Sequence, residues 1–360
     1  MGFEALRFYN FRNLLDAEVS VKAPDVFLVG ENGQGKTNVL EAVHLLALGS
    51  SFRERRDAAL LRDGGSAAGL WGLYTDAAAG DASFSIRMEP GRHKEIRVDD
   101  KLLPDRSLLF SRLLCICFVP QDMEFVAGPP EERRRFFDQT LLLSDPSLLD
   151  TLRGYRQVLR ARNLSLRGTR NDLLDVYDAQ LAGLGIAIQE RRARLVVEFD
   201  SVFGPLYREI TEEEEGVQIH YRPSWGGLRT IEEVTAHLGA QRERDRRTGT
   251  TTSGPHRDSC VYVREGKDYV PYASTGQLRL CALSLRVAQA RFLTQRTARR
   301  PLLLLDDVLL ELDPRRKSAF LSRLPPYEQA FFTFLPDENW QEYRGGTALV
   351  LRVEKGALRA

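Results

Sequence analysis

Short apolar runs alternate along the chain with segments whose apolar residues recur every three or four positions. The continuous runs at 26–29, 113–119 and 302–305 predict strands, the last of the fully buried, parallel-sheet type. Helical spacing occurs in two sets of positions: Val39, Leu40, Val43, Leu46 and Ala47, and Leu280, Leu283, Val287 and Ala290. Three further segments, 69–75, 82–88 and 94–100, predict an antiparallel layer. The pattern favours an α/β protein.

The middle of the chain differs from its two ends. Residues 131–250 are rich in Arg, Leu and Glu and predict helices, and the acidic run 211–216 is typical of a solvated helix end. We therefore expect one domain from 1–125 plus 255–360, split by a helical arm at 126–254. The arm has no sustained heptads, which excludes a very long coiled coil.

Composition narrows the class of protein. The chain has 360 residues, of which 43% are hydrophobic and 28% charged, with a formal net charge of +1. These values exclude a disordered or collagen-like chain. No apolar run approaches the roughly 18–20 residues of a membrane helix, and the N-terminus lacks the apolar core of a signal peptide. We expect a cytoplasmic protein whose four cysteines are small buried residues, since none has zinc-ligand spacing.

A phosphate-binding motif follows the first predicted strand. The segment GENGQGKT matches G-x-x-x-x-G-K-[ST] and stands between a strand and a helical pattern. Glycines allow close backbone approach, the helix N-terminus attracts anions, and the Lys and Thr side chains suit phosphate and Mg²⁺. The expected nucleotide-binding residues here are Gly30, Glu31, Asn32, Gly33, Gln34, Gly35, Lys36, Thr37 and Asn38.

Two acids end the leucine strand at 302–305. Asp306 is placed to hold Mg²⁺ together with Thr37, and Asp307 to polarise an attacking water. Lys36, which neutralises phosphate charge, is the second catalytic candidate. The bland alternative is a pair of solvated acids at a turn. Because no NKxD guanine motif is present, the sequence favours ATP over GTP.

A second anion site is predicted before the helix at 278–293. Ser274, Gly276 and Gln277 precede this helix, where a serine and a glycine can present N–H groups. By itself the segment indicates only an ordinary helix cap. About 30 residues before the acidic strand, it resembles the signature motif of ABC-type ATPases.

Together the motifs resemble the RecF family of bacterial recombination and gap-repair ATPases, of the SMC and ABC-like class. The segments that carry the resemblance are 11–14, 30–53, 128–138, 160–167, 251–258, 272–279 and 302–313, in this order along nearly the whole chain. The resemblance implies an ABC-type P-loop ATPase head split by a helical arm. It also implies DNA repair, recombination and replication, a role in the SOS response, and nucleoid association.

The resemblance further implies roles for residues. ATP and Mg²⁺ would lie between two copies of the chain, with the phosphate loop of one copy facing Ser274, Gly276 and Gln277 of the other. Gln121 would contact Mg²⁺ or the γ-phosphate, and Arg12 and Asn13 would approach the nucleotide. Leu312 and Asp313 would lie in the D-loop region. Partners would be double-stranded DNA near gap junctions, RecR, and RecA to be loaded at single-strand gaps, with no membrane. The ATPase would be weak and stimulated by DNA.

The chain departs from the family pattern at four positions. Asp307 replaces the Glu of most ABC ATPases, and its shorter reach predicts slow hydrolysis. Leu310 stands where a small polar residue is common, and Ser259 where a second acid is common. No switch histidine follows the segment 329–334, where Thr333 is the only polar candidate.

Arginines at helical spacing are candidates for DNA contact. Arg153, Arg156, Arg160, Arg167 and Arg170 would share one helix face and track phosphates without reading bases. A face paired with acids elsewhere is the alternative. For the cluster at 242–247 we favour salt bridges, and the clusters at 53–56 and 133–135 carry less weight. His256 is either an ordering hydrogen-bond partner, which we favour, or a DNA contact.

Two other functions share these motifs. The nucleotide-binding subunit of a membrane transporter would have a much shorter helical insert and an ATPase that DNA does not affect. A structural DNA-binding protein would use ATP only to gate assembly, so that repair would survive Asp307→Asn.

Overall fold

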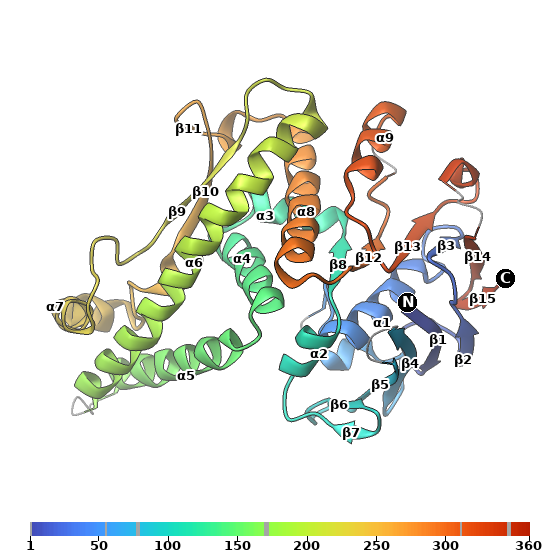
Figure 1. The fold of residues 1–360 in the computed structure, drawn as a ribbon. Coiled ribbons are helices and arrows are strands. Elements are labelled where there is room, and N and C mark those ends of the chain that lie inside the picture. The colour runs from blue at the N-terminus through green and yellow to red at the C-terminus, as the bar shows by residue number, and fades with distance from the viewer. Residues whose placement is uncertain (1, 55, 77–79, 169–172, 310–311, 344–346) are drawn as a thin grey trace. The chain divides into compact units, whose positions relative to one another are not determined.

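The computed structural model describes residues 2–54, 56–76, 80–168, 173–309, 312–343 and 347–360 (Figure 1). They form two compact units, here called unit 1 and unit 2. Unit 1 consists of Met1–Gln121 and Thr294–Ala360, and unit 2 of Asp122–Leu293. Within the described residues, no helix has both the length and the apolar character needed to cross a bilayer.

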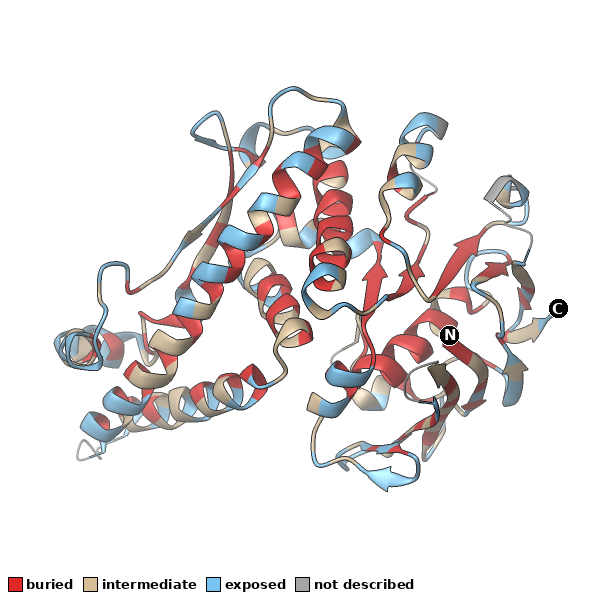
Figure 2. Cartoon of the chain, in the orientation of Figure 1, coloured by how far each residue is buried: buried red, intermediate tan, exposed pale blue. Residues whose placement is uncertain are grey.

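Unit 1 contains the predicted parallel sheet, in the order β15-β14-β3-β13-β12-β8. The strands are β3 (Asp25–Val29), β8 (Cys115–Phe118), β12 (Leu302–Leu305), β13 (Gln329–Phe334), β14 (Leu349–Glu354) and β15 (Ala357–Arg359). Only β15 is antiparallel to its neighbour. The four strands from β3 to β8 in this order are almost entirely buried (Figure 2), as their continuous apolar sequences predict.

A second, antiparallel sheet in unit 1 has the order β2-β1-β4-β5-β6-β7. Its strands are β1 (Gly2–Tyr9), β2 (Ala17–Ser20), β4 (Ala68–Asp76), β5 (Gly80–Met88), β6 (Glu95–Val98) and β7 (Lys101–Leu102). The predictions at 69–75, 82–88 and 94–100 are confirmed as β4, β5 and β6. Helix α1 (Lys36–Leu48) contacts strands of both sheets. It is therefore buried on nearly all sides, beyond the single stripe that its spacing predicted.

Unit 2 is mainly helical. Its helices are α3 (Glu124–Ala127), α4 (Pro130–Ser144), α5 (Leu148–Arg167), α6 (Leu174–Thr211), α7 (Ile231–Thr248) and most of α8 (Thr275–Thr297). A small sheet, β11-β10-β9, combines β9 (Gln218–Arg222), β10 (Ser259–Arg264) and β11 (Lys267–Asp268). Helix α6 ends at Thr211, where the acidic run begins, as predicted.

The remaining helices are short. Unit 1 adds α2 (Ser107–Arg112) and α9 (Pro314–Arg323). The 3₁₀ turns are η1 (Asp57–Leu60), η2 (Pro120–Met123), η3 (Pro255–Arg257), η4 (Val270–Tyr272) and η5 (Trp340–Tyr343). All four cysteines are buried and unbridged, as the sequence predicted.

Chain contacts group residues 255–293 with the helices of unit 2, whereas the sequence-based division assigned these residues to the head. Strand β10 pairs with β9, which explains the grouping, because β9 belongs to the predicted arm. The division into a head and an arm stays a prediction.

One arginine is the polar centre of unit 2. Arg162 has no exposed side-chain surface and donates to Asp178 Oδ1 at 2.6 Å, to Asp245 Oδ2 at 2.7 Å and to Thr251 Oγ1 at 2.9 Å. These partners come from α6, α7 and the segment after α7. A buried charge needs such pairing. Arg162 therefore links α6, α7 and the segment after α7 within unit 2.

Candidate functional site

The phosphate loop lies between the end of β3 at Val29 and the start of α1 at Lys36. Gly33 and Gly35 have φ values of 78° and 118°, which favour glycine. A Cβ on Gly35 would lie 2.9 Å from Asn13 Oδ1, and one on Gly30 would lie 2.3 Å from the carbonyl oxygen of Val353. The glycines of the motif are thus required by the backbone path and by close neighbours.

Lys36 is enclosed by this loop. Only 4% of its surface is exposed, and Nζ donates to the carbonyl oxygens of Gly30 at 2.6 Å and Glu31 at 3.0 Å. The loop therefore holds a buried positive charge beside the first turn of α1, whose N–H groups have no acceptor within the helix. This combination suits a phosphate anion.

The acid pair stands at the same edge of the sheet, because parallel strands present their carboxyl ends together. Asp306 follows β12, and its Oδ1 accepts a hydrogen bond from Thr37 Oγ1 at 2.9 Å. Strand β13 lies between β3 and β12 and carries Thr333. The N–H of Asp307 donates to Thr333 Oγ1 at 2.8 Å, and this hydroxyl lies 2.9 Å from Asp307 Oδ1.

Burial, and then the negative charge of Asp307, raise the pKa of Asp306 to about 6. The hydrogen bonds from Thr37 and Thr333 oppose this rise. Thr37 Oγ1 and Asp306 Oδ1, a partly desolvated carboxylate oxygen, lie 2.9 Å apart beside the phosphate loop. Hard divalent cations such as Mg²⁺ prefer oxygen ligands of this kind, so Thr37 and Asp306 fit a Mg²⁺ site.

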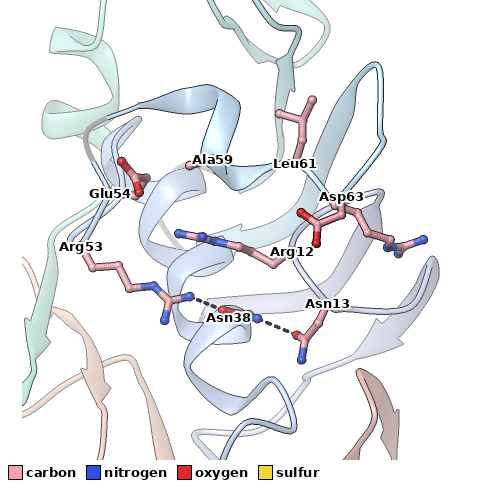
Figure 3. Close-up of a pocket in the computed structure, with 9 residues that line it drawn as sticks. Arg12, Asn13, Asn38, Arg53, Glu54, Ala59, Leu61 and Asp63 are labelled. Carbon is pink, nitrogen blue, oxygen red and sulfur yellow. Dashed lines mark hydrogen bonds between the residues drawn. The ribbon is translucent and has the colours of Figure 1, made fainter.

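A cavity of about 650 Å³ opens beside α1 (Figure 3). It is lined by Arg12, Asn13, Asn38, Arg53, Glu54, Ala59, Leu61, Arg62 and Asp63. Asn38 is hydrogen-bonded to both Arg53 and Asn13, as Figure 3 shows. The cavity is lined by Asn38, in the first turn of α1 just after the phosphate loop, and by Arg12 and Asn13, the two residues expected near the nucleotide.

Sequence reasoning missed the anchor of this cavity. Glu41 is fully buried and accepts from Arg12 Nε at 3.0 Å and from Arg53 Nη2 at 2.7 Å. Burial alone would raise the pKa of Glu41, but the bonds from Arg53 and Arg12 outweigh it and the pKa is lowered. In the sequence, Glu41 is one polar residue among the apolar positions of a helical pattern. Only its burial in the structure distinguishes it as a functional residue.

The other residues of the loop are more open. Glu31 and Asn32 are exposed, and Gln34 Oε1 accepts from the N–H of Lys355 at 2.6 Å. Gln121 is exposed in η2, directly after β8, whose Phe118 is in register with Leu305 of β12. Gln121 thus follows β8, the strand next to β12, and β12 ends at Asp306.

Only part of the predicted D-loop region lies within the described residues. Asp313 caps α9 by accepting from the N–H of Arg316 at 2.9 Å. Leu310, the predicted departure in this loop, lies outside the described residues.

The predicted second anion site is the N-terminus of α8 in unit 2. The N–H of Gln277 donates to Ser274 Oγ at 3.3 Å, and the N–H of Ser274 donates to Gln277 Oε1 at 3.0 Å. This reciprocal pair is a capping box. Gly276 is exposed, and a Cβ there would meet open space. The helix cap is confirmed, whereas a role in binding phosphate from another copy stays a prediction.

The arginine stripe lies on α5. Arg153, Arg156, Arg160 and Arg167 are exposed there, and Arg170 lies outside the described residues. Nε of Arg167 also donates to the carbonyl oxygen of Gly249 at 2.8 Å. These exposed positions suit contact with phosphates, and the DNA-binding role of the stripe stays a prediction.

The remaining basic clusters are mostly paired. Salt bridges in the 242–247 cluster are confirmed, since Arg242 binds Asp178 at 2.5 Å and Arg247 binds Glu243 at 2.9 Å. In the cluster at 133–135, Arg134 donates to the carbonyl oxygen of Asp258 at 2.6 Å.

His256 acts within unit 2 as a structural partner. Its Nδ1 lies 2.8 Å from the hydroxyl of Tyr155, and its Nε2 lies 2.9 Å from the carbonyl oxygen of Thr251. Both ring nitrogens therefore have partners inside the unit. This favours the ordering role over a DNA contact.

Three features define a P-loop protein with an ABC-type ATPase head. They are the glycine loop before α1, the strand β12 that ends at the acid pair Asp306 and Asp307, and the strand β13 between β3 and β12. Comparison with known proteins narrows this class. The family model described as "RecF/RecN/SMC N terminal domain" matches residues 3–342. The chain belongs to the RecF family of this group, on the strength of that match and of the following relatives.

The chain is 38% identical over 354 residues to a DNA replication and repair protein RecF of Treponema pallidum (strain Nichols), covering 97% of this chain and 98% of the relative. A second RecF, from Anaeromyxobacter sp. (strain Fw109-5), is 35% identical over 366 residues, covering 99% and 98%. The solved structure of the recombination mediator protein RecF with ATP, in the RecFOR pathway, superposes with a TM-score of 0.91 at 27% identity, covering 99% and 97%.

A more distant likeness concerns the fold alone. An SMC head bound to the C-winged helix domain of ScpA gives a TM-score of 0.54 at 14% identity, covering 100% of this chain and 97% of the other. Together with the family model and the RecF structure, this fold confirms the ABC-type head predicted from the sequence.

Proposed function

We propose that this chain binds ATP with Mg²⁺ at the phosphate loop and uses slow hydrolysis to control its assembly on double-stranded DNA. The observation that carries the proposal is the contact between Thr37 Oγ1 and Asp306 Oδ1 at 2.9 Å, beside a loop that encloses Lys36. The RecF structure with bound ATP supports the choice of nucleotide.

In this proposal each part of the site has a task. Lys36 and the first N–H groups of α1 hold the phosphates, and Thr37 and Asp306 hold the cation with Gln121 nearby. When bound, Mg²⁺ neutralises phosphate charge. Asp307 orients and polarises the attacking water. The cavity beside Arg12 and Asn13 receives the rest of the nucleotide.

Assembly follows from the second anion site. In the proposed homodimer, the N-terminus of α8 in one copy faces the phosphates bound by the other copy. Ser274, Gly276 and Gln277 would thus complete the site in trans. Loss of the shared phosphate after hydrolysis removes this contact, so nucleotide state selects between two assembly states.

The DNA surface is the exposed face of α5. Arg153, Arg156, Arg160 and Arg167 would track phosphates, which predicts affinity that falls with salt and little sequence preference. The structural relative is a recombination mediator of the RecFOR pathway, which supports partnership with RecR. Action near single-strand gaps, where RecA is loaded, is part of the same proposal.

The test is the mass of the protein in solution with and without ATP and Mg²⁺, using Asp307→Asn to stop turnover. We expect ATP to convert monomer to dimer, and Ser274→Arg to block this conversion. Thr230→Arg is the matched control, because Thr230 caps α7 through a capping box of the same kind. A cap loss costs about 1 kcal/mol in either helix. An unchanged mass in every condition would refute the shared site.

DNA binding is tested by the salt dependence of affinity for a duplex. We expect Arg156→Gln and Arg160→Gln each to lower the slope of log K against log salt by ~1 per lost phosphate contact. Arg87→Gln is the control, since Arg87 is an exposed arginine of β5 that pairs with Glu89. Equal effects of all three variants would refute α5 as the DNA surface.

A further inference from the structure

The hydroxyl of Thr333 meets both carboxylates of the acid pair. Its Oγ1 lies 2.8 Å from the backbone nitrogen of Asp307, 2.9 Å from Asp307 Oδ1 and 3.3 Å from Asp306 Oδ1. Thr333 is 4% exposed and belongs to β13, the strand between β3 and β12. Its contacts with both acids distinguish Thr333 from a β-branched residue that only fills the core.

The geometry assigns the single proton of this hydroxyl. Oγ1 accepts from the N–H of Asp307, so its own proton is available for one carboxylate. Asp307 Oδ1 is the nearer acceptor at 2.9 Å, and Asp306 Oδ1 already receives the proton of Thr37 Oγ1. Thr333 therefore ties Asp307 at two points, at its amide and at its carboxylate.

Asp307 needs such a tie because its backbone is strained. Its φ is 53°, in the left-handed region that non-glycine residues rarely adopt. Such a conformation persists where its surroundings over-determine it. The bond to the amide stabilises this backbone, and the bond to Oδ1 fixes the direction in which Oδ2 points.

We propose that Thr333 is a positioning residue for hydrolysis, which holds Asp307 in the orientation that activates water. The inference rests on the proposed function, in which Asp307 is the catalytic acid-base residue. It accounts for a threonine at the end of β13, since the hydroxyl faces the acid pair rather than open solvent.

The experiment compares steady-state ATP hydrolysis of wild type with Thr333→Val, Thr333→Ser and Thr333→Cys. Valine keeps the β-branched shape that suits a strand and removes the hydroxyl. A hydrogen bond to a charged group corresponds to ~10- to 100-fold in rate. We expect T333V to lower kcat by this factor with KM within about threefold, T333S to stay near wild type, and T333C to fall between them because a thiol bonds weakly.

The matched control is Thr140→Val. Thr140 is also fully buried, and its Oγ1 donates to the carbonyl oxygen of Phe136 at 2.9 Å and accepts from Gln289 Nε2 at 2.8 Å, within unit 2. This variant loses a comparable pair of bonds and should lose stability while keeping kcat. Equal losses of kcat in T333V and T140V would overturn the assignment, because they would indicate a general loss of stability.

A double-mutant cycle separates this inference from the proposed function. If Thr333 acts through Asp307, T333V causes no further loss of single-turnover rate in the Asp307→Asn background. If the rate losses of the two single variants instead multiply in the double variant, the inference is overturned. Wild-type turnover in D307N alone would overturn the catalytic role of Asp307 and this inference with it. A loss in D307N with unchanged kcat in T333V would overturn the inference alone.

Discussion

Acid should weaken unit 2 through His256, and the effect can be calculated from the structure. Because the carbonyl of Thr251 only accepts, Nε2 of the neutral ring carries the proton and Nδ1 accepts from the hydroxyl of Tyr155. Burial lowers the pKa of His256 from 6.5 to about 4, and the positive charges of Arg257 and Arg134 act in the same direction. The folded protein therefore resists protonation of this ring.

The sign follows from linkage. A histidine whose pKa is lower in the folded state binds its proton first in the unfolded state, so stability is complete above pH 6.5 and falls as pH decreases from 6.5 towards 4. The displacement from 6.5 to about 4 corresponds to about 3 kcal/mol at ~1.4 kcal/mol per pKa unit. At pH 5, linkage gives a loss of about 2 kcal/mol from this residue.

The assay is urea unfolding between pH 8 and pH 5, for wild type and His256→Gln. Trp225 is a local reporter, since it is 2% exposed and its Nε1 donates to Ser253 Oγ at 3.2 Å. Replacement of Trp71 and Trp340 by Phe isolates its fluorescence. Glutamine keeps a donor near the position of Nε2 and cannot take up the proton, so it removes this titration alone.

We expect the difference in unfolding free energy between wild type and H256Q to shrink by about 2 kcal/mol from pH 8 to pH 5. A difference that stays constant with pH would refute the assignment of a buried, neutral ring. Duplex affinity measured at pH 8 serves as a second readout. If H256Q loses affinity there while its stability is unchanged, His256 is a DNA contact and the ordering role is wrong.

Three further predictions concern buried charges. Arg162→Met leaves the carboxylate of Asp245 without its buried arginine and should lower the unfolding free energy of unit 2 by roughly 3–5 kcal/mol in denaturant titrations. Glu41→Gln releases Arg12 at the wall of the cavity, and we expect at least tenfold weaker binding of a fluorescent ATP analogue with little change in kcat. Asp306→Asn, studied in EDTA, should raise stability by about 3 kcal/mol at pH 8, because the pKa of Asp306 is raised from 3.8 to about 6 and the charged form is penalised above that pH. The gain should vanish below about pH 4, and thermal unfolding at the two pH values measures it.

Local sequence patterns predicted the parts of the site that are local. The loop from Gly30 to Thr37 is bounded by an apolar strand and a helix, and each of these elements has its own periodicity. The strand before Asp306 is four consecutive leucines, the continuous apolar run that is typical of a buried parallel strand. Such elements are predictable because the signal and the structure involve the same residues.

The contacts between distant elements were not predictable in this way. The strand order places β13 between β3 and β12, and this order alone brings Thr333 to the acid pair. Likewise, spacing predicted an exposed arginine face on α5, but gave no sign that Arg162 in the same run is buried against Asp178 and Asp245. The partners lie 16 and 83 residues away in sequence, so no periodic pattern within α5 encodes them.

The polar groups of the phosphate site satisfy one another in this structure. Lys36 donates to two loop carbonyls and Thr37 donates to Asp306. Nucleotide and cation must therefore exchange these bonds for new ones, and such exchanges contribute little net energy. The exception is Asp306, because burial and the neighbouring charge of Asp307 disfavour its ionised form. A divalent cation relieves this penalty directly, whereas a nucleotide without the cation adds negative charge near it. The structure therefore predicts that binding of the two is strongly coupled, with the acid pair as the source of the coupling.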